Sequence, residues 1–103
     1  NVEIYHDAGA STVPWHIRLV EGKADTYSIV SRKSGKYLHV AHAGTSDGDN
    51  VEIYHASGGT TAASQWRVRK VPDAENTYTL ESVNAEGKYL HVAHGGTGDG
   101  ANV

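Results

Sequence analysis

The octapeptide GKYLHVAH stands at residues 35–42 and returns without change at residues 87–94. A second stretch, NVEIYH, stands at residues 1–6 and returns without change at residues 50–55. The spacing between the copies is close to fifty residues in both cases, so the chain consists of one unit that occurs twice, with short insertions in its loops.

The boundaries of the repeat follow from the recurring Asn-Val dipeptide. We assign residues 1–49 to the first copy, residues 50–101 to the second, and residues 102–103 to the start of a third. The whole chain has 103 residues and a mass of 11.0 kDa, which is the size of a single domain. We therefore treat residues 1–103 as one domain built from repeats.

Within each copy the apolar residues alternate with polar ones. Val51 and Ile53 alternate with Glu52 and Tyr54, and the same period of two recurs in four runs of each copy. Stretches rich in Gly, Asn, Asp and Ser separate these runs and are typical of turns. No run of useful length has the period of a helix, so the sequence predicts an all-β fold with four short strands in each copy.

The composition excludes several classes of function. The formal net charge of −3 argues against a nucleic-acid groove, and the apolar stretches are too short for membrane insertion. The chain has no cysteine, which rules out disulfides and thiolate nucleophiles and leaves its cellular compartment unspecified. No serine stands in a strand-turn-helix elbow, and no glycine-rich loop precedes a helix, so we expect no enzymatic activity.

Four strands in about fifty residues, repeated, with one tryptophan in each copy, fit a β-trefoil better than a propeller blade or an immunoglobulin-like sandwich. The chain resembles the ricin B-type lectin family. The resemblance covers essentially the whole chain and is carried by the runs at residues 35–40, 47–54, 64–66 and 78–80. It implies a β-trefoil whose function is non-catalytic carbohydrate binding, with galactose or N-acetylgalactosamine as the sugar type.

The resemblance has two departures. Ser64 stands at the glutamine position of the family's Gln-x-Trp signature, and His39 and His91 stand where the family carries a sugar-binding aspartate. Because the family buries this tryptophan near the floor of the barrel, the resemblance implies that Trp15 and Trp66 are both core residues.

The alternation also predicts a surface site. His39, Glu52 and Tyr54 have the outward parity on two strands that pair in a trefoil, so we expect them to converge on one patch. There Tyr54 falls where the family's stacking aromatic lies, and His39 and Glu52 would contact sugar hydroxyls. Together with flanking histidines and the repeated positions, the predicted carbohydrate-binding residues are Glu3, Tyr5, His6, His39, His42, Glu52, Tyr54, His55, His91 and His94.

Other interpretations remain open at this stage. The spacing His39-x-x-His42 raises the question of a metal site, but strand parity places the two imidazoles on opposite faces, so we expect no metal and no cofactor. A protein-binding trefoil, such as a protease inhibitor or a relative of the actin-bundling proteins, is one alternative function. The targeting module of a larger toxin or glycosidase is another. Repeated surface residues favour multivalent glycan binding over a protein-binding trefoil, and nothing in the sequence excludes a targeting module.

The length sharpens the prediction of the fold. A closed trefoil needs three units, and these 103 residues supply two. An open gap would expose the core faces of the flanking strands, which is costly for a small core. We therefore expect that a further repeat or another chain completes the trefoil.

Overall fold

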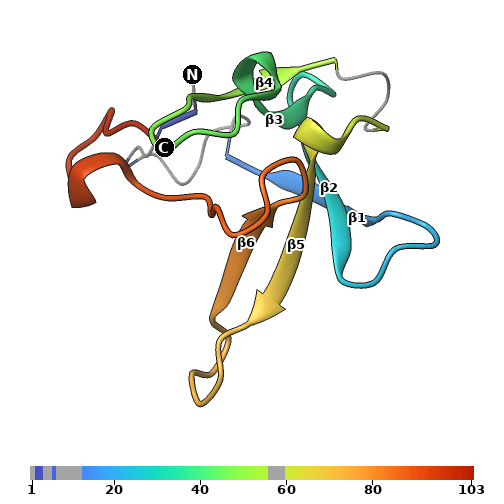
Figure 1. Ribbon diagram of the computed structural model, residues 1–103. Coiled ribbons are helices and arrows are strands. Elements are labelled where there is room, and N and C mark those ends of the chain that lie inside the picture. The colour runs from blue at the N-terminus through green and yellow to red at the C-terminus, as the bar shows by residue number, and fades with distance from the viewer. Residues whose placement is uncertain (1, 4–5, 7–12, 56–59) are drawn as a thin grey trace.

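The computed structural model describes residues 2–3, 6, 13–55 and 60–103. These residues form six β-strands joined by turns and by short 3-10 helices, fewer than the four strands per copy that the alternating pattern predicts (Figure 1). The predicted all-β class is confirmed. No helix in the described ranges is long and apolar enough to cross a membrane. The strands are β1 (Trp15–Leu19), β2 (Thr26–Ser31), β3 (Tyr37–Val40), β4 (Val51–Tyr54), β5 (Gln65–Lys70) and β6 (Tyr78–Ser82), and the 3-10 helices are η1 (Ala41–Ala43), η3 (Ala62–Ser64) and η4 (Ala93–Gly95).

All strand pairs are antiparallel. The strands follow the order β4-β3-β2-β5-β6, and β1 also pairs with β2. Figure 1 shows the two hairpins, β1–β2 and β5–β6, extending from the part of the molecule that holds β3 and β4. β2 is the junction between the hairpins, because its residues 26–28 pair with β5 and its residues 27–31 pair with β1.

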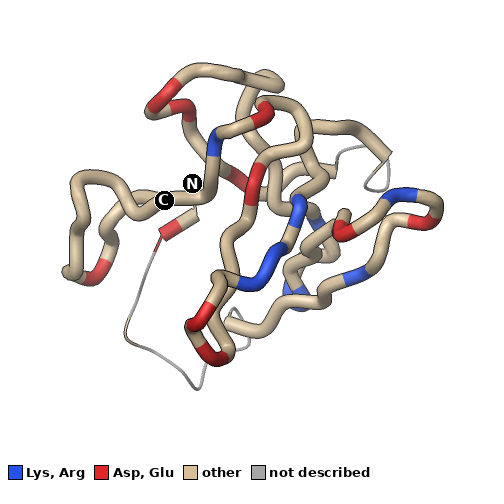
Figure 2. Tube along the Cα trace, turned by 60° about the horizontal axis from the view of Figure 1, so that its bottom comes forward, with Lys and Arg blue, Asp and Glu red and all other residues tan. Residues whose placement is uncertain are grey.

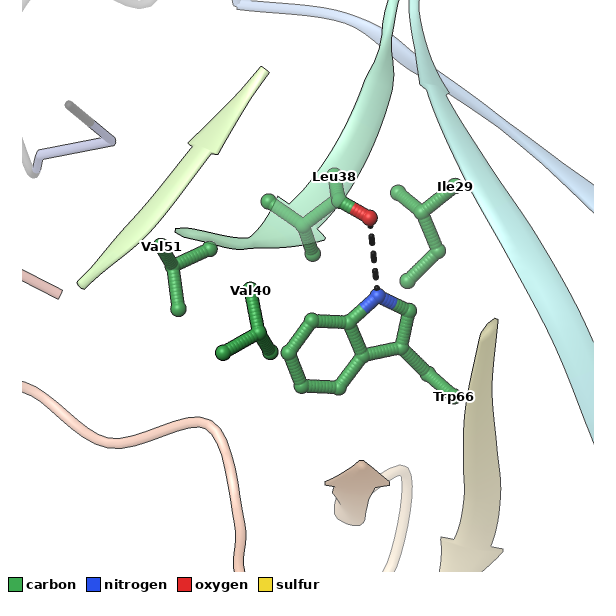
Figure 3. Close-up of a cluster of buried hydrophobic side chains, with 5 residues drawn as sticks. All are labelled: Ile29, Leu38, Val40, Val51 and Trp66. Carbon is green, nitrogen blue, oxygen red and sulfur yellow. Dashed lines mark hydrogen bonds between the residues drawn. The ribbon is translucent and has the colours of Figure 1, made fainter. Parts of the chain in front are cut away.

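The core lies where these strands meet (Figure 3). It consists of Ile29, Leu38, Val40, Val51 and Trp66, all of which are buried. Trp66 is 1% exposed, and its indole Nε1 donates a hydrogen bond of 3.1 Å to the backbone carbonyl of Leu38. The prediction that Trp66 is a core residue is therefore confirmed.

The corresponding prediction for Trp15 is wrong. Trp15 is 38% exposed, and every residue of β1 is exposed to solvent. The reason lies in its surroundings: β3 covers Trp66, and no strand within the described ranges takes the equivalent place over Trp15. Identical positions in the repeat thus have different environments.

The fourth strand of the second copy is also incomplete. β3 pairs with β4 over four residues, whereas Tyr89 forms only an isolated bridge with Glu81 and remains 53% exposed. Ala93 N donates to Asn102 O at 2.8 Å, as Ala41 N donates to Asn50 O at 2.9 Å. The second pairing thus begins as the first does.

Val2, Val51 and Val103, the valines of the three Asn-Val dipeptides, lie close together. Val2 N donates to Val51 O at 3.1 Å, and Val103 N donates to Val2 O at 3.2 Å. The side-chain amide of Asn102 donates to the amide oxygen of Asn50 at 3.1 Å. Equivalent residues from three points of the repeat therefore contact one another around a common centre, as a threefold arrangement requires.

Candidate carbohydrate-binding site

The centre of the predicted patch is a cross-strand pair. His39 on β3 lies directly opposite Glu52 on β4, and a hydrogen bond of 3.1 Å joins its Nδ1 to Glu52 Oε2. Directly opposed residues on one face of an antiparallel pair are close enough for such contacts. The Glu52 side chain is 30% exposed and the His39 side chain only 10%, so the imidazole holds a carboxylate that still reaches solvent.

Tyr54 extends this pair into an aromatic cluster. Its ring is stacked on the imidazole of His39, with centroids 4.9 Å apart, and on that of His55, with centroids 4.3 Å apart. Tyr54 nevertheless remains 45% exposed, and His55 is also exposed. The three rings therefore fix one another's orientation while leaving an aromatic surface open to solvent.

His39 lies deeper than the outward parity predicts. The residue is 8% exposed, because the Tyr54 ring stacks on it and Glu52 is bonded to it. The groups that reach solvent are therefore Glu52, Tyr54 and His55, and the buried His39 contacts Glu52 and Tyr54.

His42 and His94 occupy equivalent and unusual backbone positions. Each is the middle residue of a 3-10 turn, η1 or η4, with a φ of 57° at His42 and 56° at His94, in the left-handed region that few residues adopt without constraint. Both side chains are exposed. Within the described ranges no hydrogen bond or ring contact joins His42 to the cluster of His39, Glu52, Tyr54 and His55, so His42 lies outside the assembled group.

The remaining predicted residues are not assembled into a second cluster within the described part of the chain. Glu3 is exposed and forms a bridge with Asn102, and His91 is exposed. The ring of His6 contacts the carboxylate of Asp99. Tyr5 lies outside the described residues. Among the described residues, the predicted side chains are therefore brought together between β3 and β4, where both halves of the motif pair.

An ion pair between the two copies of the repeat was not predicted. Lys88 Nζ donates to Asp47 Oδ1 at 2.6 Å, which joins the loop after η1 to the second copy of Gly-Lys-Tyr. The hydrogen bond and the positive charge of Lys88 hold the pKa of Asp47 below its usual value. Asn84 strengthens the same junction, because its amide donates to Ala43 O at 2.7 Å. In the sequence, the repeated lysine was the feature that could have indicated this contact. The residues around Asp47 have the composition of a turn, so they did not indicate that Asp47 is the partner of Lys88.

The described residues hold no group of three His, Asp or Glu side chains arranged for a metal ion. The histidine pairs separated by two residues, which raised the question of a metal, do not converge. The chemistry of the assembled group is thus that of a carboxylate and aromatic rings on an open surface.

Comparison with known families identifies the fold. Residues 13–103 match the model of the ricin-type beta-trefoil lectin domain-like family. The chain belongs to this family. Its all-β architecture is accordingly that of a β-trefoil, as the repeat pattern predicts, and the family supports carbohydrate binding in general and is typically non-catalytic. No curated protein matches the sequence.

Solved structures agree with this family assignment. The designed threefold-symmetric protein ThreeFoil is 38% identical with a TM-score of 0.81, and the match covers 95% of this chain and 65% of ThreeFoil. The Polyporus squamosus lectin, in a complex with the human-type influenza-binding epitope Neu5Acα2-6Galβ1-4GlcNAc, is 26% identical with a TM-score of 0.68, over 86% of this chain and 30% of that one.

A third structure, described as the PSL1a–E64 complex, shares the fold alone. It is 22% identical with a TM-score of 0.63, and the match covers 86% of this chain and 28% of that chain. The chain therefore spans just under two thirds of ThreeFoil and about a third of each of the other two proteins.

Proposed function

We propose that the chain is a non-catalytic lectin and that the cluster of His39, Glu52, Tyr54 and His55 binds a galactose-type or N-acetylgalactosamine-type sugar. The observation that carries the proposal is the exposed Tyr54 ring held beside the Glu52 carboxylate by the buried His39. Family membership supports the class of ligand, and the sugar type rests on the resemblance to ricin B-type lectins.

The chemistry of the cluster suits a pyranose. An aromatic ring covers the apolar C–H face of such a sugar, and a carboxylate accepts hydrogen bonds from its hydroxyls. Tyr54, which is 45% exposed, offers the ring and Glu52 the acceptor, while the exposed imidazole of His55 adds a polar group next to the tyrosine. Because stacking already fixes these rings, little side-chain entropy is lost when a ligand binds.

Repetition of the motif indicates multivalency. His91 repeats the His39 half of the site, and Glu3 with His6 repeats the half that β4 supplies. Several equivalent weak sites on one assembly bind clustered glycans more tightly than one site does, without any new contact.

The test is a glycan array followed by titration with the best soluble monovalent sugar. Tyr54→Ala and Glu52→Gln each remove one element of the site, and both residues are at least partly exposed, so the variants should fold. Tyr78→Ala is the matched control, because Tyr78 is an exposed tyrosine on β6, at 53%. We expect each site variant to weaken binding of the monovalent sugar about tenfold or more, and the control to leave it unchanged.

A blank array with folded protein would contradict carbohydrate binding. Binding that is indifferent to both substitutions would contradict the site, and preference for sugars unrelated to galactose would contradict the sugar type alone. The three parts of the proposal thus have separate outcomes.

A further inference from the structure

Tyr37 lies directly opposite Tyr54 where β3 pairs with β4. This pair of tyrosines is two residues along the strands from the pair of His39 and Glu52, and side chains two residues apart point to the same face of a strand. Tyr37 therefore shares the face on which His39, Glu52, Tyr54 and His55 form their cluster, although it is not a member of that cluster.

The side chain of Tyr37 is half-buried and has no polar or stacking partner within the described ranges. The ring contacts of Tyr54 are with the imidazoles of His39 and His55, and none is with Tyr37. Among the described residues no buried polar side-chain atom lacks a partner, so the unbonded hydroxyl of Tyr37 reaches solvent. Such a tyrosine can contact the apolar face of a ligand and bond one of its polar groups at the same time.

The spacing along the strand determines how long a ligand must be to reach Tyr37. Because Tyr54 stacks on His39, the surface that Tyr54 and Glu52 offer is centred on the pair of His39 and Glu52. Tyr37 lies about 7 Å further along β3, at about 3.4 Å for each residue. That step is close to the length of one pyranose unit. A sugar held by Glu52 and Tyr54 therefore leaves Tyr37 for the next unit of an oligosaccharide.

Charge on this face favours a neutral ligand. Residues 37–55 contain no lysine or arginine, so the blue segments of Figure 2 belong to other parts of the chain. Lys36 directly precedes Tyr37, but its carbonyl accepts a bond of 2.8 Å from Ser31 N, so the ladder reaches Lys36 and its side chain has the opposite parity. The charged group beside the two tyrosines is the Glu52 carboxylate, which disfavours an anionic group placed next to it.

We propose that Tyr37 forms a second subsite beside the cluster and that the ligand is a neutral oligosaccharide of at least two pyranose units. This inference rests on the proposed function, because the cluster holds the first unit. The second unit lies against the Tyr37 ring, within reach of its hydroxyl. Tyr37 thus provides selectivity for the longer glycan and does not recognise the first sugar.

Calorimetric titration with galactose, lactose and melibiose tests the second subsite, because the two disaccharides extend galactose through a β and an α linkage. We expect at least one disaccharide to bind the wild-type chain about three- to tenfold more tightly than galactose, which is the gain from one further aromatic contact. Tyr37→Leu keeps an apolar side chain at this half-buried position but removes the aromatic face. It should abolish the gain and leave the affinity for galactose unchanged.

Two further variants complete the comparison. Tyr37→Phe keeps the ring and should retain most of the gain. Tyr78→Ala is the matched control, because Tyr78 is an exposed tyrosine on β6, and it should leave the affinities for all three sugars unchanged. Titration with 3′-sialyllactose tests the charge, and we expect it to bind no more tightly than lactose.

The second subsite is wrong if neither disaccharide binds more tightly than galactose. It is also wrong if Tyr37→Leu weakens galactose and the disaccharides by the same factor, since Tyr37 then acts on the first unit or on the fold, or if Tyr37→Phe loses the gain as fully as Tyr37→Leu. Tighter binding of 3′-sialyllactose than of lactose would contradict a neutral ligand. If the folded chain binds none of these sugars, the proposed function fails, which is a different result from galactose binding without a gain.

Discussion

Trp15 and Trp66 occupy equivalent positions of the repeat, yet Trp66 is 1% exposed and bonded to the carbonyl of Leu38, whereas Trp15 is 38% exposed. The difference arises from what lies above each indole and not from the strands that carry them. β3 covers Trp66, and no strand within the described ranges takes the equivalent place over Trp15. The two tryptophans therefore report separately on the core and on the exposed strand β1.

The first prediction compares Trp66→Phe with Trp15→Phe. Trp66→Phe leaves the buried carbonyl of Leu38 without its donor and removes part of a packed ring, so the free energy of unfolding should fall by about 2 kcal/mol. Trp15→Phe should change it by less than about 0.5 kcal/mol in the monomer, as is usual for exposed positions. Urea denaturation followed by circular dichroism at low protein concentration measures both. Equal effects would show that Trp15 is buried in solution.

Much of the fold could be predicted because the repeat reports on strand number and order. The motif at residues 35–42 predicted β3, and its pairing with β4 followed from the family resemblance. The exposure of Trp15 and the missing strand at Tyr89 could not be predicted, because identical sequences predict identical environments unless the neighbouring strands are known. His39 shows the same limit: its parity was outward, but the Tyr54 ring that covers it comes from another strand.

A second prediction concerns Gly44. Its φ of −64° is ordinary for any residue, so the requirement for glycine is one of space. A Cβ there would lie 2.7 Å from Cγ of Asp49, whose Oδ2 accepts a hydrogen bond from Ser46 N at 2.9 Å. Gly44→Ala should therefore displace Asp49 and destabilise the chain by about 1–3 kcal/mol. The thermal unfolding midpoint measures the effect.

Gly96 supplies the control for this prediction. A Cβ at Gly96 would lie 3.1 Å from the Cβ of Ala101, a milder contact with a smaller side chain. Gly96→Ala should cost less than Gly44→Ala, and Asp49→Ala should relieve much of the defect of Gly44→Ala. A double variant no better than Gly44→Ala would rule out overlap with Asp49 as the cause.

A third prediction follows from the Asp47–Lys88 pair. Because the hydrogen bond and charge of Lys88 lower the pKa of Asp47 in the folded chain, the pair stabilises that state at pH values above the unfolded pKa. This stabilisation is lost as the pH falls towards the lowered folded pKa. Carboxyl carbon shifts in an NMR titration should show Asp47 titrating below the usual aspartate range, and Lys88→Gln should raise its pKa.

Lys36→Gln is the matched control for that titration. Lys36 has the same place in the first Gly-Lys-Tyr that Lys88 has in the second. The Lys36→Gln variant should therefore leave the pKa of Asp47 unchanged. If Lys88→Gln also leaves it unchanged, the ion pair does not persist in solution.

The last prediction separates the roles of His39 and Glu52 in ligand binding. The His39 side chain is only 10% exposed, so it acts through the Glu52 carboxylate that it holds at 3.1 Å. His39→Ala should therefore weaken sugar binding by about five- to tenfold, which corresponds to the loss of one oriented charged hydrogen bond, or about 1–1.4 kcal/mol. Combined with Glu52→Gln, it should add little further loss, because both substitutions remove the same oriented acceptor. Calorimetric titration of the two single variants and the double variant with one monovalent sugar measures this coupling, and strictly additive losses would mean that His39 contacts the sugar by itself.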